Sequence, residues 1–405
     1  MIEPRRALLS CLGRMVLVGV MLESPLFLFT QSSSSPPASS HAAGRGDAWW
    51  KGITADGFVS FSYTYNSDDP VPRVNQFRVF DFNDDDPQLD VAQLVIQHPA
   101  NESGQIGFRL NLMAGSGVPE IAASYGLFRD THTGIAHHFD APEFYLSYKA
   151  AVGKGLRLDA GKFVTHLGYE VIGGYDGYND NFSRSFIFGY GIPFTHTGMK
   201  ASYPFSGKIS AALLLTNGSD AVTTLNGGVT VGVQFALVPS KTTTLTFNLL
   251  HGPERPHNAH DQRSVYELTA GWKVAPRFSL GFDGLYADED HAAVNGSDAI
   301  WKGLAGYSKY NLTQEFSLAF RGEVFADIGG SRTGTAQTLR GFTVTPEYVL
   351  PANLSRLNSE LRRLDGKFVI RGEFRQDLSD QDSFRRGTGF SNQQFTSAVN
   401  LIYLF

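Results

Sequence analysis

Charged side chains recur at every second position in several extended stretches of this 405-residue chain. The segments "FRGE" (320–323) and "IRGEF" (370–374) each put an arginine and a glutamate on one face of a strand, because successive side chains of a strand alternate between its faces. A charged face suits wet surroundings, and rings of charge at a narrow point set which ions pass. The candidates for such a charged lining are Arg109, Lys149, Arg157, Arg321, Glu323, Arg371, Glu373 and Arg375.

A second group of charged residues lies in one long connection, "THLGYEVIGGYDGYNDNFSRSFIFGYGIP" (165–193), which is rich in glycine and tyrosine. If this connection narrows an enclosed space, its acids would face the arginines of the surrounding wall. The resulting transverse field would order water and select small polar solutes. The residues that would form this constriction are Glu170, Asp176, Asp180 and Arg184.

The two "RGE" segments (321–323 and 371–373) also fit a simpler interpretation. Arg321 could pair with Glu323, and Arg371 with Glu373, which would only neutralise a wet interior. The sequence does not decide between a field and such pairs. The glycine of each segment falls on the opposite, apolar phase, where it indicates strand bending rather than the approach of a ligand.

Three other features have residue types that could form chemical sites. The acidic stretch "DFNDDDPQLD" (81–90) offers hard oxygen ligands for calcium, but it lacks the spacing of an EF-hand, so a solvated loop is predicted. The histidines of "HGPERPHNAHDQ" (251–262) lie in a connection and are predicted to be exposed rather than zinc ligands. His196 and Ser202 are too far apart along a strand for catalysis, and no nucleophile motif is present. The sequence thus predicts no enzyme, metal or cofactor.

The composition favours strands and turns. The chain has 43 glycines, 13 % aromatic and only 18 % charged residues, with a net charge of −5. No basic stripe stands out, so nucleic acid is not an expected partner. No uncharged run of 18 or more apolar residues predicts a transmembrane helix, but alternating strands can cross a bilayer without such a run.

The N-terminus has the order of a secretory signal. Three arginines (Arg5, Arg6 and Arg14) begin it, the apolar stretch "MVLVGVMLESPLFLF" follows, and small polar residues come next. The only cysteine, Cys11, lies in this leader, so no disulfide is expected afterwards. We therefore predict a signal peptide over 1–42, a periplasmic linker over 43–56 and one domain over 57–405.

That domain is predicted to be all-β. From Gly57 to the end, about sixteen segments alternate apolar and polar residues, at a length that crosses a bilayer as a tilted strand. Short connections alternate with long ones, which puts every long loop at one end, as in outer-membrane barrels. The long ones cover 66–88, 115–140, 164–193, 217–227, 251–262, 287–298, 326–336 and 377–392. The prediction is a single transmembrane antiparallel up-and-down β-barrel of about 16 strands, with short periplasmic turns and long outer loops.

Two features concern the ends of strands. Residues 351–364 should form a short turn but are long, and their leucines follow a helical spacing, so a periplasmic helical insert is expected there. The chain ends in the alternating stretch "SAVNLIYLF" (397–405). A closing strand pairs with the first strand and leaves no edge, so the chain can stop at Phe405 inside the sheet.

The stretches "LRLDAGKFVTHLGYE" (156–170), "NDNFSRSFIFGYGIPFTHTGMKASYPF" (179–205) and "GKFVIRGEFRQDLSD" (366–380) resemble the OmpL-like group of β-barrel porins, over roughly residues 55–405. The resemblance implies a channel in the outer membrane of a Gram-negative-type bacterium, for solutes that are mostly unassigned in the group. By analogy with general diffusion porins, it implies that 164–193 folds into the barrel and that the protein is a homotrimer. The terminal Phe405 resembles the signal read by the outer-membrane assembly machinery.

The function predicted from the sequence is therefore passive diffusion of small hydrophilic solutes or ions across the outer membrane, in contact with its lipids. Two alternatives stay open at this stage. One is an outer-membrane barrel enzyme of the lipase or protease type. The other is a structural or adhesive barrel with a plugged lumen, although no loop is long enough to form a separate plug domain.

Overall fold

The computed structural model describes residues 52–71, 73–118, 125–130, 133–172, 179–352 and 366–405. In them, sixteen antiparallel strands form one closed barrel, which confirms the predicted fold class. Each strand pairs with its neighbours in the chain, apart from the closing pair and a small hairpin in the last outer loop. The barrel strands are β1 (Thr54–Asn66), β2 (Gln88–His98), β3 (Ile106–Ala114), β4 (Phe139–Ala150), β5 (Leu156–Val164), β6 (Thr195–Pro204), β7 (Ile209–Thr216), β8 (Thr230–Ser240), β9 (Thr243–Gly252), β10 (Arg263–Ala275), β11 (Phe278–Glu289), β12 (Ala299–Asn311), β13 (Phe316–Asp327), β14 (Gln337–Ala352), β15 (Gly366–Ser379) and β18 (Gln393–Leu404).

The last strand closes the barrel against the first. Val59 of β1 stands opposite Tyr403 of β18, and the Gly57 amide donates a hydrogen bond to the Phe405 carbonyl at 3.0 Å. The Phe405 amide donates back to the Gly57 carbonyl at 2.9 Å. The terminal residue is thus held within the sheet, where no strand edge remains open. The strand β1 begins at Thr54, slightly before the predicted start of the domain at Gly57.

The connections alternate in length as the sequence predicts. Short turns such as 151–155 between β4 and β5 lie at one end, and Gly153 and Gly155 there adopt positive φ angles of 55° and 101°, which favour glycine. The long loops lie at the other end, and the last of them carries the hairpin of β16 (Phe384–Arg386) and β17 (Gly389–Ser391). The helical insert predicted at 351–364 lies mostly outside the described residues; β14 itself continues to Ala352.

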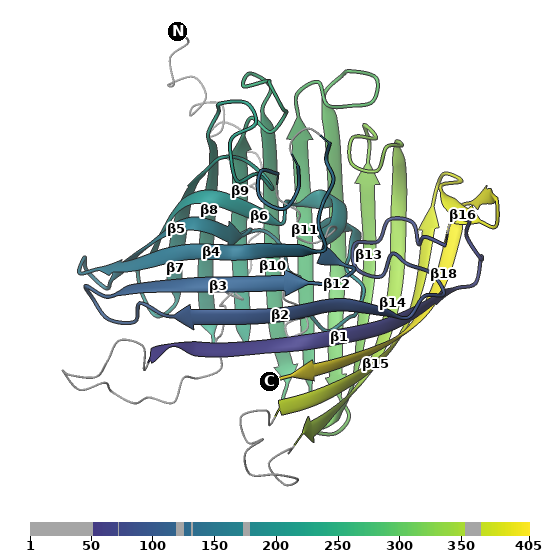
Figure 1. Ribbon diagram of the computed structural model, residues 1–405, viewed down its shortest axis with the longest axis horizontal. Helices are drawn as coiled ribbons and strands as arrows, with labels where there is room; N and C mark the ends of the chain where they lie inside the picture. The colour runs from purple at the N-terminus through teal and green to yellow at the C-terminus, as the bar shows by residue number, and fades with distance from the viewer. Residues whose placement is uncertain (1–51, 72, 119–124, 131–132, 173–178, 353–365) are drawn as a thin grey trace.

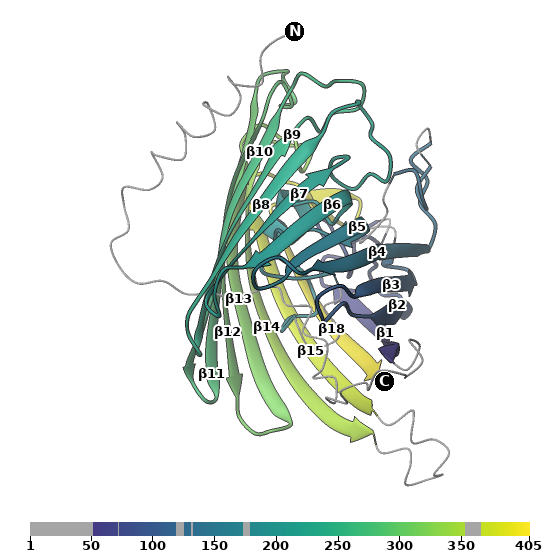
Figure 2. The same cartoon turned by 90° about the vertical axis from the view of Figure 1, so that its left-hand side faces the viewer.

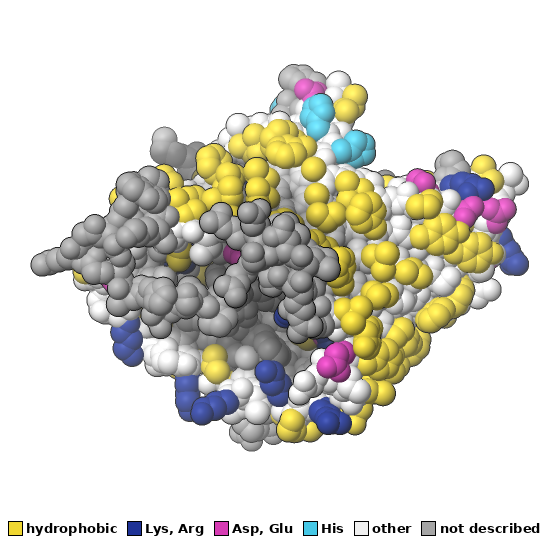
Figure 3. Space-filling view, turned by 60° about the horizontal axis from the view of Figure 1, so that its bottom comes forward, with side chains coloured by type: hydrophobic (Ala, Val, Ile, Leu, Met, Phe, Trp, Pro, Cys, Tyr) yellow, Lys and Arg dark blue, Asp and Glu magenta, His cyan; other side chains and the backbone are white. Residues whose placement is uncertain are grey.

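The outer surface is apolar. Large side chains on alternate strand positions are widely exposed, among them Ile106 (68 %), Phe144 (63 %) and Phe374 (53 %). In Figure 3, hydrophobic side chains form a broad band over one half of the visible face, while Lys and Arg gather along its lower edge. None of the described residues forms a helix that is long and apolar enough to span a membrane.

The two walls of the barrel face each other across the lumen. Figures 1 and 2 show β1–β5 as one wall and β9–β14 as the opposite wall, with their strands running in crossed directions, as tilted strands of a barrel must. Apolar residues of the long loop between β5 and β6 are buried inside, including Phe182, Phe186 and the short π-helix η3 (Ile187–Gly191). The lumen is therefore partly filled by a folded loop.

Candidate channel constriction

The described parts of the loop between β5 and β6, residues 165–172 and 179–194, lie in the interior and contact the wall formed by β10–β15. At its start, the Gly168 amide donates to the Glu267 carboxylate of β10 at 2.8 Å. At its end, the Asp220 carboxylate accepts hydrogen bonds from the amides of Phe194 (2.9 Å) and Thr195 (2.8 Å). Both ends of the loop are thus fixed by carboxylates that bind backbone N–H groups.

Wall glutamates bind the middle of the loop in the same way. The Glu373 carboxylate of β15 accepts the amide hydrogens of Phe182 (2.7 Å) and Ser183 (2.9 Å). The Glu323 carboxylate of β13 accepts the amide hydrogen of Phe186 at 2.5 Å. Hydrogen bonds to a charged acceptor are stronger than neutral ones, and they satisfy loop amides that water does not reach.

Wall arginines bind the carbonyl groups of the loop. Arg321 of β13 donates to the Ser183 carbonyl at 2.6 Å. From β15, Arg375 donates to the Arg184 carbonyl at 2.6 Å and Arg371 donates to the Asn179 carbonyl at 3.0 Å. These three arginine side chains are almost completely buried. The wall thus holds the loop through its backbone, with both signs of charge.

The predicted loop acids also contact the wall directly. Glu170 forms an ion pair with Arg321 at 2.9 Å, and Asp180 forms one with Lys309 of β12 at 2.8 Å. The guanidinium of Arg184 lies over the Phe80 ring, 4.3 Å from its centroid. The fourth predicted residue, Asp176, lies outside the described residues. Loop acids and wall cations therefore meet in contact rather than across an open gap.

The two "RGE" segments form different pairs. Arg321 pairs with Glu323 at 3.1 Å, as the simpler interpretation expects. Arg371 instead pairs with Glu347 of β14 at 2.7 Å, while Glu373 binds loop amides and the Thr345 hydroxyl. The difference follows from the register, because Glu347 stands directly opposite Arg371 on the neighbouring strand.

The first outer loop, residues 67–87, also folds inward. Arg78 donates to the Asp377 carboxylate of β15 at 2.7 Å and to the Thr396 hydroxyl of β18 at 3.0 Å. Next to it, the buried ring of Phe80 packs against Phe188 of η3, with centroids 6.3 Å apart. The prediction of a solvated acidic loop over 81–90 is therefore wrong at Asp81 and Asp84, which are buried in this second inserted segment.

Three further residues bind the loop without having been predicted from the sequence, namely Lys309 and Trp301 on β12 and Arg332 in the connection between β13 and β14. Lys309 pairs with Asp180, the Trp301 indole donates to the Gly191 carbonyl at 3.0 Å, and Arg332 donates to the Tyr190 carbonyl at 2.6 Å. Trp301 and Lys309 occupy the phase opposite the exposed Leu304 and Tyr310 on β12. The alternation along β12 predicts an inward position for both residues, but nothing in the sequence indicates which loop residues they contact.

The wall formed by β3–β6 carries charges that the loop does not cover. Arg109 pairs with Glu143 at 2.6 Å, and Arg157 pairs with Asp159 at 2.8 Å. Lys200 lies 3.5 Å from the same Asp159. These basic side chains stay 17 %, 39 % and 25 % exposed, respectively, whereas the two acids are almost fully buried. Lys149 is half-buried near the short turns, where its ammonium donates to the Asn101 carbonyl. We call Arg109, Lys149, Arg157 and Lys200 the basic patch.

One titratable group of the loop stays uncharged. His166 is buried, and burial lowers its pKa to about 3, with the neighbouring His196 acting in the same direction. Its Nε2 atom lies 2.9 Å from the Leu249 carbonyl of β9. In the part of the chain that the structure describes, no three His, Cys, Asp or Glu side chains converge as ligands for a metal ion.

Comparison with known proteins agrees with this architecture. The family described as "Putative beta-barrel porin-2, OmpL-like" matches residues 52–405. No curated protein sequence matches the chain.

Solved structures share the fold at low sequence identity. OmpF of Salmonella typhi in complex with daunomycin aligns with a TM-score of 0.57 and 11 % identity, over 87 % of this chain and 97 % of that one. An anion-selective porin from Comamonas acidovorans aligns with a TM-score of 0.55 and 10 % identity, over 87 % and 99 %. The trimer form of OmpT of Vibrio cholerae, folded in vitro, aligns with a TM-score of 0.50 and 11 % identity, over 87 % and 99 %.

Proposed function

Because the chain belongs to the OmpL-like family of β-barrel porins of the bacterial outer membrane, we propose that it forms a water-filled pore for passive diffusion of small hydrophilic solutes or ions. The pore runs between the inserted loop (165–194) and the wall formed by β3–β6. The observation that carries this proposal is the unequal exposure of the two walls. Only the β3–β6 wall offers charged groups of the predicted lining that water reaches.

The predicted lining residues divide into two roles under this proposal. Arg109, Lys149 and Arg157 contact solutes. The remaining five, Arg321, Glu323, Arg371, Glu373 and Arg375, hold the loop in place. Glu170, Asp180 and Arg184 belong to the same anchoring system, so the width of the constriction is set by buried charges and its selectivity by exposed ones.

The pore prefers anions in this proposal. The basic patch contributes four positive side chains, and their two acidic partners, Glu143 and Asp159, are buried beneath them. A passing ion therefore meets ammonium and guanidinium groups first, and a low-dielectric wall strengthens their field. The expected preference is moderate, because each buried acid still offsets part of the field.

The test is single-channel conductance of the refolded chain, starting after the predicted signal peptide, in a planar bilayer with a salt gradient. Stable open steps with a reversal potential on the anion side support the proposal. A barrel that inserts and passes no current would contradict it. A reversal potential on the cation side would contradict only the assignment of the basic patch.

A second candidate, a plugged structural or adhesive barrel, is favoured by one observation. The inserted segments bury a continuous apolar cluster in the lumen, which includes Phe80, Phe182, Phe186 and Phe188. A closed barrel would pass no current even when the loop anchors are intact. Activity as a lipase or protease has no such support, since His196 is buried and bound to Thr165.

The partners follow from the same family membership. The last strand, which ends at Phe405 and pairs with β1, is proposed to be read by the outer-membrane assembly machinery. A homotrimer is proposed by analogy, since one similar porin was solved in a trimer form. Residues 1–42 are proposed to direct export and to be removed.

A further inference from the structure

An open groove lies on the outer face of the β10–β14 wall. Its volume is about 510 Å³. At its centre, Gly306 of β12 and Gly322 of β13 stand directly opposite each other, and a Cβ atom built at either position would meet no side chain within 4 Å. Two adjacent positions without side chains thus leave a hollow in a wall that is otherwise covered.

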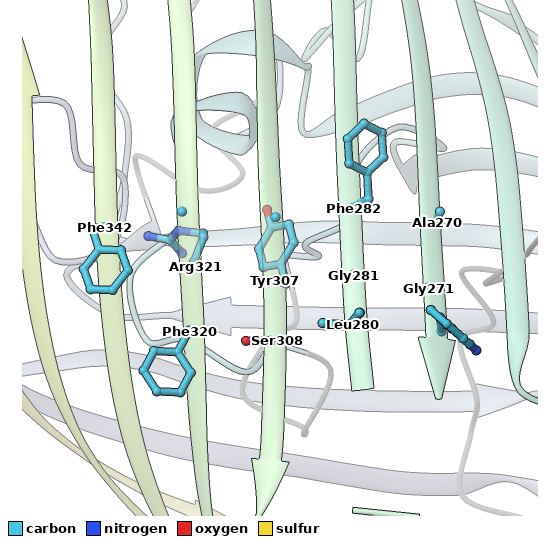
Figure 4. A pocket seen from close by; sticks show the side chains of 13 residues that line it. Ala270, Gly271, Leu280, Gly281, Phe282, Tyr307, Ser308, Phe320, Arg321 and Phe342 are labelled. Carbon is cyan, nitrogen blue, oxygen red and sulfur yellow. The ribbon is translucent and has the colours of Figure 1, made fainter. Parts of the chain in front are cut away.

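Aromatic side chains form the sides of this groove. Phe282 pairs in register with Gly306, and Phe342 pairs with Gly322, so an aromatic residue stands beside each glycine on the neighbouring strand. Phe320 and Trp272 extend the sides towards the short turns. Phe282, Phe342 and Trp272 are 38 %, 56 % and 44 % exposed, which puts them on the lipid-facing side. Figure 4 shows Phe320 and Phe342 on one side of Tyr307 and Phe282 on the other side.

The glycine of "RGE" at 321–323 therefore opens a surface hollow. Its neighbour Arg321 points inward and binds the loop, while Gly322 is exposed outward. In a bilayer, such a hollow is filled by acyl chains, because no water is present at this depth. An apolar groove alone does not choose between lipids, so any selectivity must come from charge.

Two basic side chains stand above the groove on the same face. Lys302 lies two outward positions from Gly306 on β12, and Arg340 lies one outward position from Phe342 on β14. Both are exposed, and neither forms an ion pair with another described residue. Asp288 of β11 is an acid on the same face. It stands opposite Ile300, which is one outward position closer to the outer loops than Lys302.

The heights of these groups match one leaflet. Near the outer loops, Lys302 pairs in register with Tyr286. Tyr310 lies eight residues further along β12, near the short turns, so an aromatic residue marks each membrane interface at this strand. At about 3.3 Å per residue, Gly306 lies about 13 Å along the strand from Lys302, close to mid-membrane. A charged side chain on the lipid-facing surface costs little free energy only near the membrane interface. Lys302 and Arg340 lie at the end of the groove nearest the outer loops, which fits this requirement.

We propose that this groove, with Lys302 and Arg340, binds a phosphate-bearing lipid of the outer leaflet. The phosphate lies between the two cations, and one acyl chain runs along Leu304 into the hollow over Gly306 and Gly322. Juxtamembrane Lys and Arg side chains bind anionic lipid headgroups in this way. Lipid binding in this groove does not require an open pore, so the test of the lipid site is independent of the test of the proposed pore.

The test is native mass spectrometry of the solubilised barrel after incubation with a diphosphorylated, acylated glucosamine disaccharide. Phosphatidylcholine and inorganic phosphate serve as separate probes. Wild type should retain the phosphorylated lipid and release phosphatidylcholine. The double variant Lys302→Gln/Arg340→Gln should bind it about 30-fold more weakly, because each such cation is worth about fivefold. The matched control, Lys208→Gln/Lys241→Gln, removes two exposed charges at the opposite rim and should change nothing.

A second variant tests the groove itself. Gly306→Leu/Gly322→Leu fills open space and should fold, since a Cβ atom at either position meets no side chain within 4 Å. It should lose lipid retention while both cations remain. The proposal would be overturned if both double variants retained the phosphorylated lipid as well as wild type does. It would also be overturned if wild type retained phosphatidylcholine as well as the phosphorylated lipid. Binding of inorganic phosphate without the lipid would overturn it too. Loss of oligomers in the leucine variant, with or without lipid, would instead identify the groove as an interface between copies.

Discussion

The β10–β15 wall and the β3–β6 wall carry the same kinds of charged side chain, but they expose them differently. On the first wall, the side chains of Arg321 and Arg375 have no exposed area. On the second, Arg157 keeps 39 % of its side-chain surface exposed. The loop (165–194) accounts for the difference, because it covers one wall and leaves the other. Residue type alone therefore does not distinguish an anchoring charge from a charge that meets solutes.

The comparison also explains why the buried charges persist. An arginine without partners in a dry interior is very costly, but here each one donates to carbonyls of the loop and to a wall carboxylate. Removing one partner leaves the others unpaired, so the anchors should act as a unit. On the β3–β6 wall, Arg109, Arg157 and Lys200 stay partly exposed to water, so single changes at these three residues should be mild.

The largest effect is expected from Arg321→Ala. It leaves Glu170 and Glu323 buried without their main cation, at a cost of about 3–5 kcal/mol. The loop should detach from the wall, so single-channel conductance should rise and proteinase K should cleave within 165–194. Arg157→Ala on the opposite wall is the matched control for loop anchoring and should leave the loop protected from proteinase K. Wild-type conductance and protection in Arg321→Ala would show that the anchors do not fix the loop.

A smaller effect is expected from Glu373→Gln. The amide keeps the shape of the side chain but loses the charge that accepts the Phe182 and Ser183 amide hydrogens, and each hydrogen bond to a charged group contributes about 1.5–3 kcal/mol. Partial loosening should appear as more frequent switching between current levels. Glu143→Gln, on the β3–β6 wall, provides the comparison. If both variants switch equally often, the two walls do not differ in the way described.

Acid should loosen the start of the loop. The folded-state pKa of His166 is about 3, below its ordinary value near 6.5, so the unfolded segment takes up the proton first. Stability is complete above about pH 6.5 and falls by about 1.4 kcal/mol per pH unit as the pH drops towards 3. Proteinase K should thus cleave the loop faster at pH 5 than at pH 7, relative to an unfolded peptide. The variant His166→Gln should lack this extra sensitivity, and an unchanged pH dependence in that variant would exclude His166 as its source.

The smallest effect on structure, and a clear one on selectivity, is expected from Arg157→Gln. The Arg157 side chain is partly exposed and Lys200 stays beside the buried Asp159, so its loss should cost less than about 1 kcal/mol of stability. The reversal potential in a salt gradient should move towards cations. Lys309→Gln, which removes a mostly covered cation of the opposite wall, should move it less. The reverse order would assign selectivity to the loop-bearing wall.

Much of the fold could be predicted from the sequence. Period-two alternation and the asymmetry of the loops determine a closed antiparallel barrel, because each strand must bury its polar face and pair both edges. The inward phase of residues such as Arg109 and Arg321 follows from the same alternation. The closing pair between β1 and β18 could be expected because a barrel leaves no free edge.

The contacts of the inserted loops could not be predicted. Arg78 and Asp377 are 299 residues apart, and nothing near either residue specifies the other. The two "RGE" segments are identical in sequence, yet Arg321 faces Thr343 across the sheet while Arg371 faces Glu347. Arg321 therefore pairs along its own strand and Arg371 pairs across. Register decides this, and no local pattern of either segment encodes it.

The central claim is that the open path follows the β3–β6 wall. Ser202 of β6 and Thr343 of β14 both point inward, but Ser202 is only partly buried and Thr343 is fully buried beneath the loop. Since Cys11 lies in the predicted leader, Ser202→Cys and Thr343→Cys would each carry a single thiol after its removal. A negatively charged thiol reagent should reduce the single-channel current of Ser202→Cys and leave Thr343→Cys unaffected. A reduced current in Thr343→Cys, with Ser202→Cys unchanged, would contradict the account.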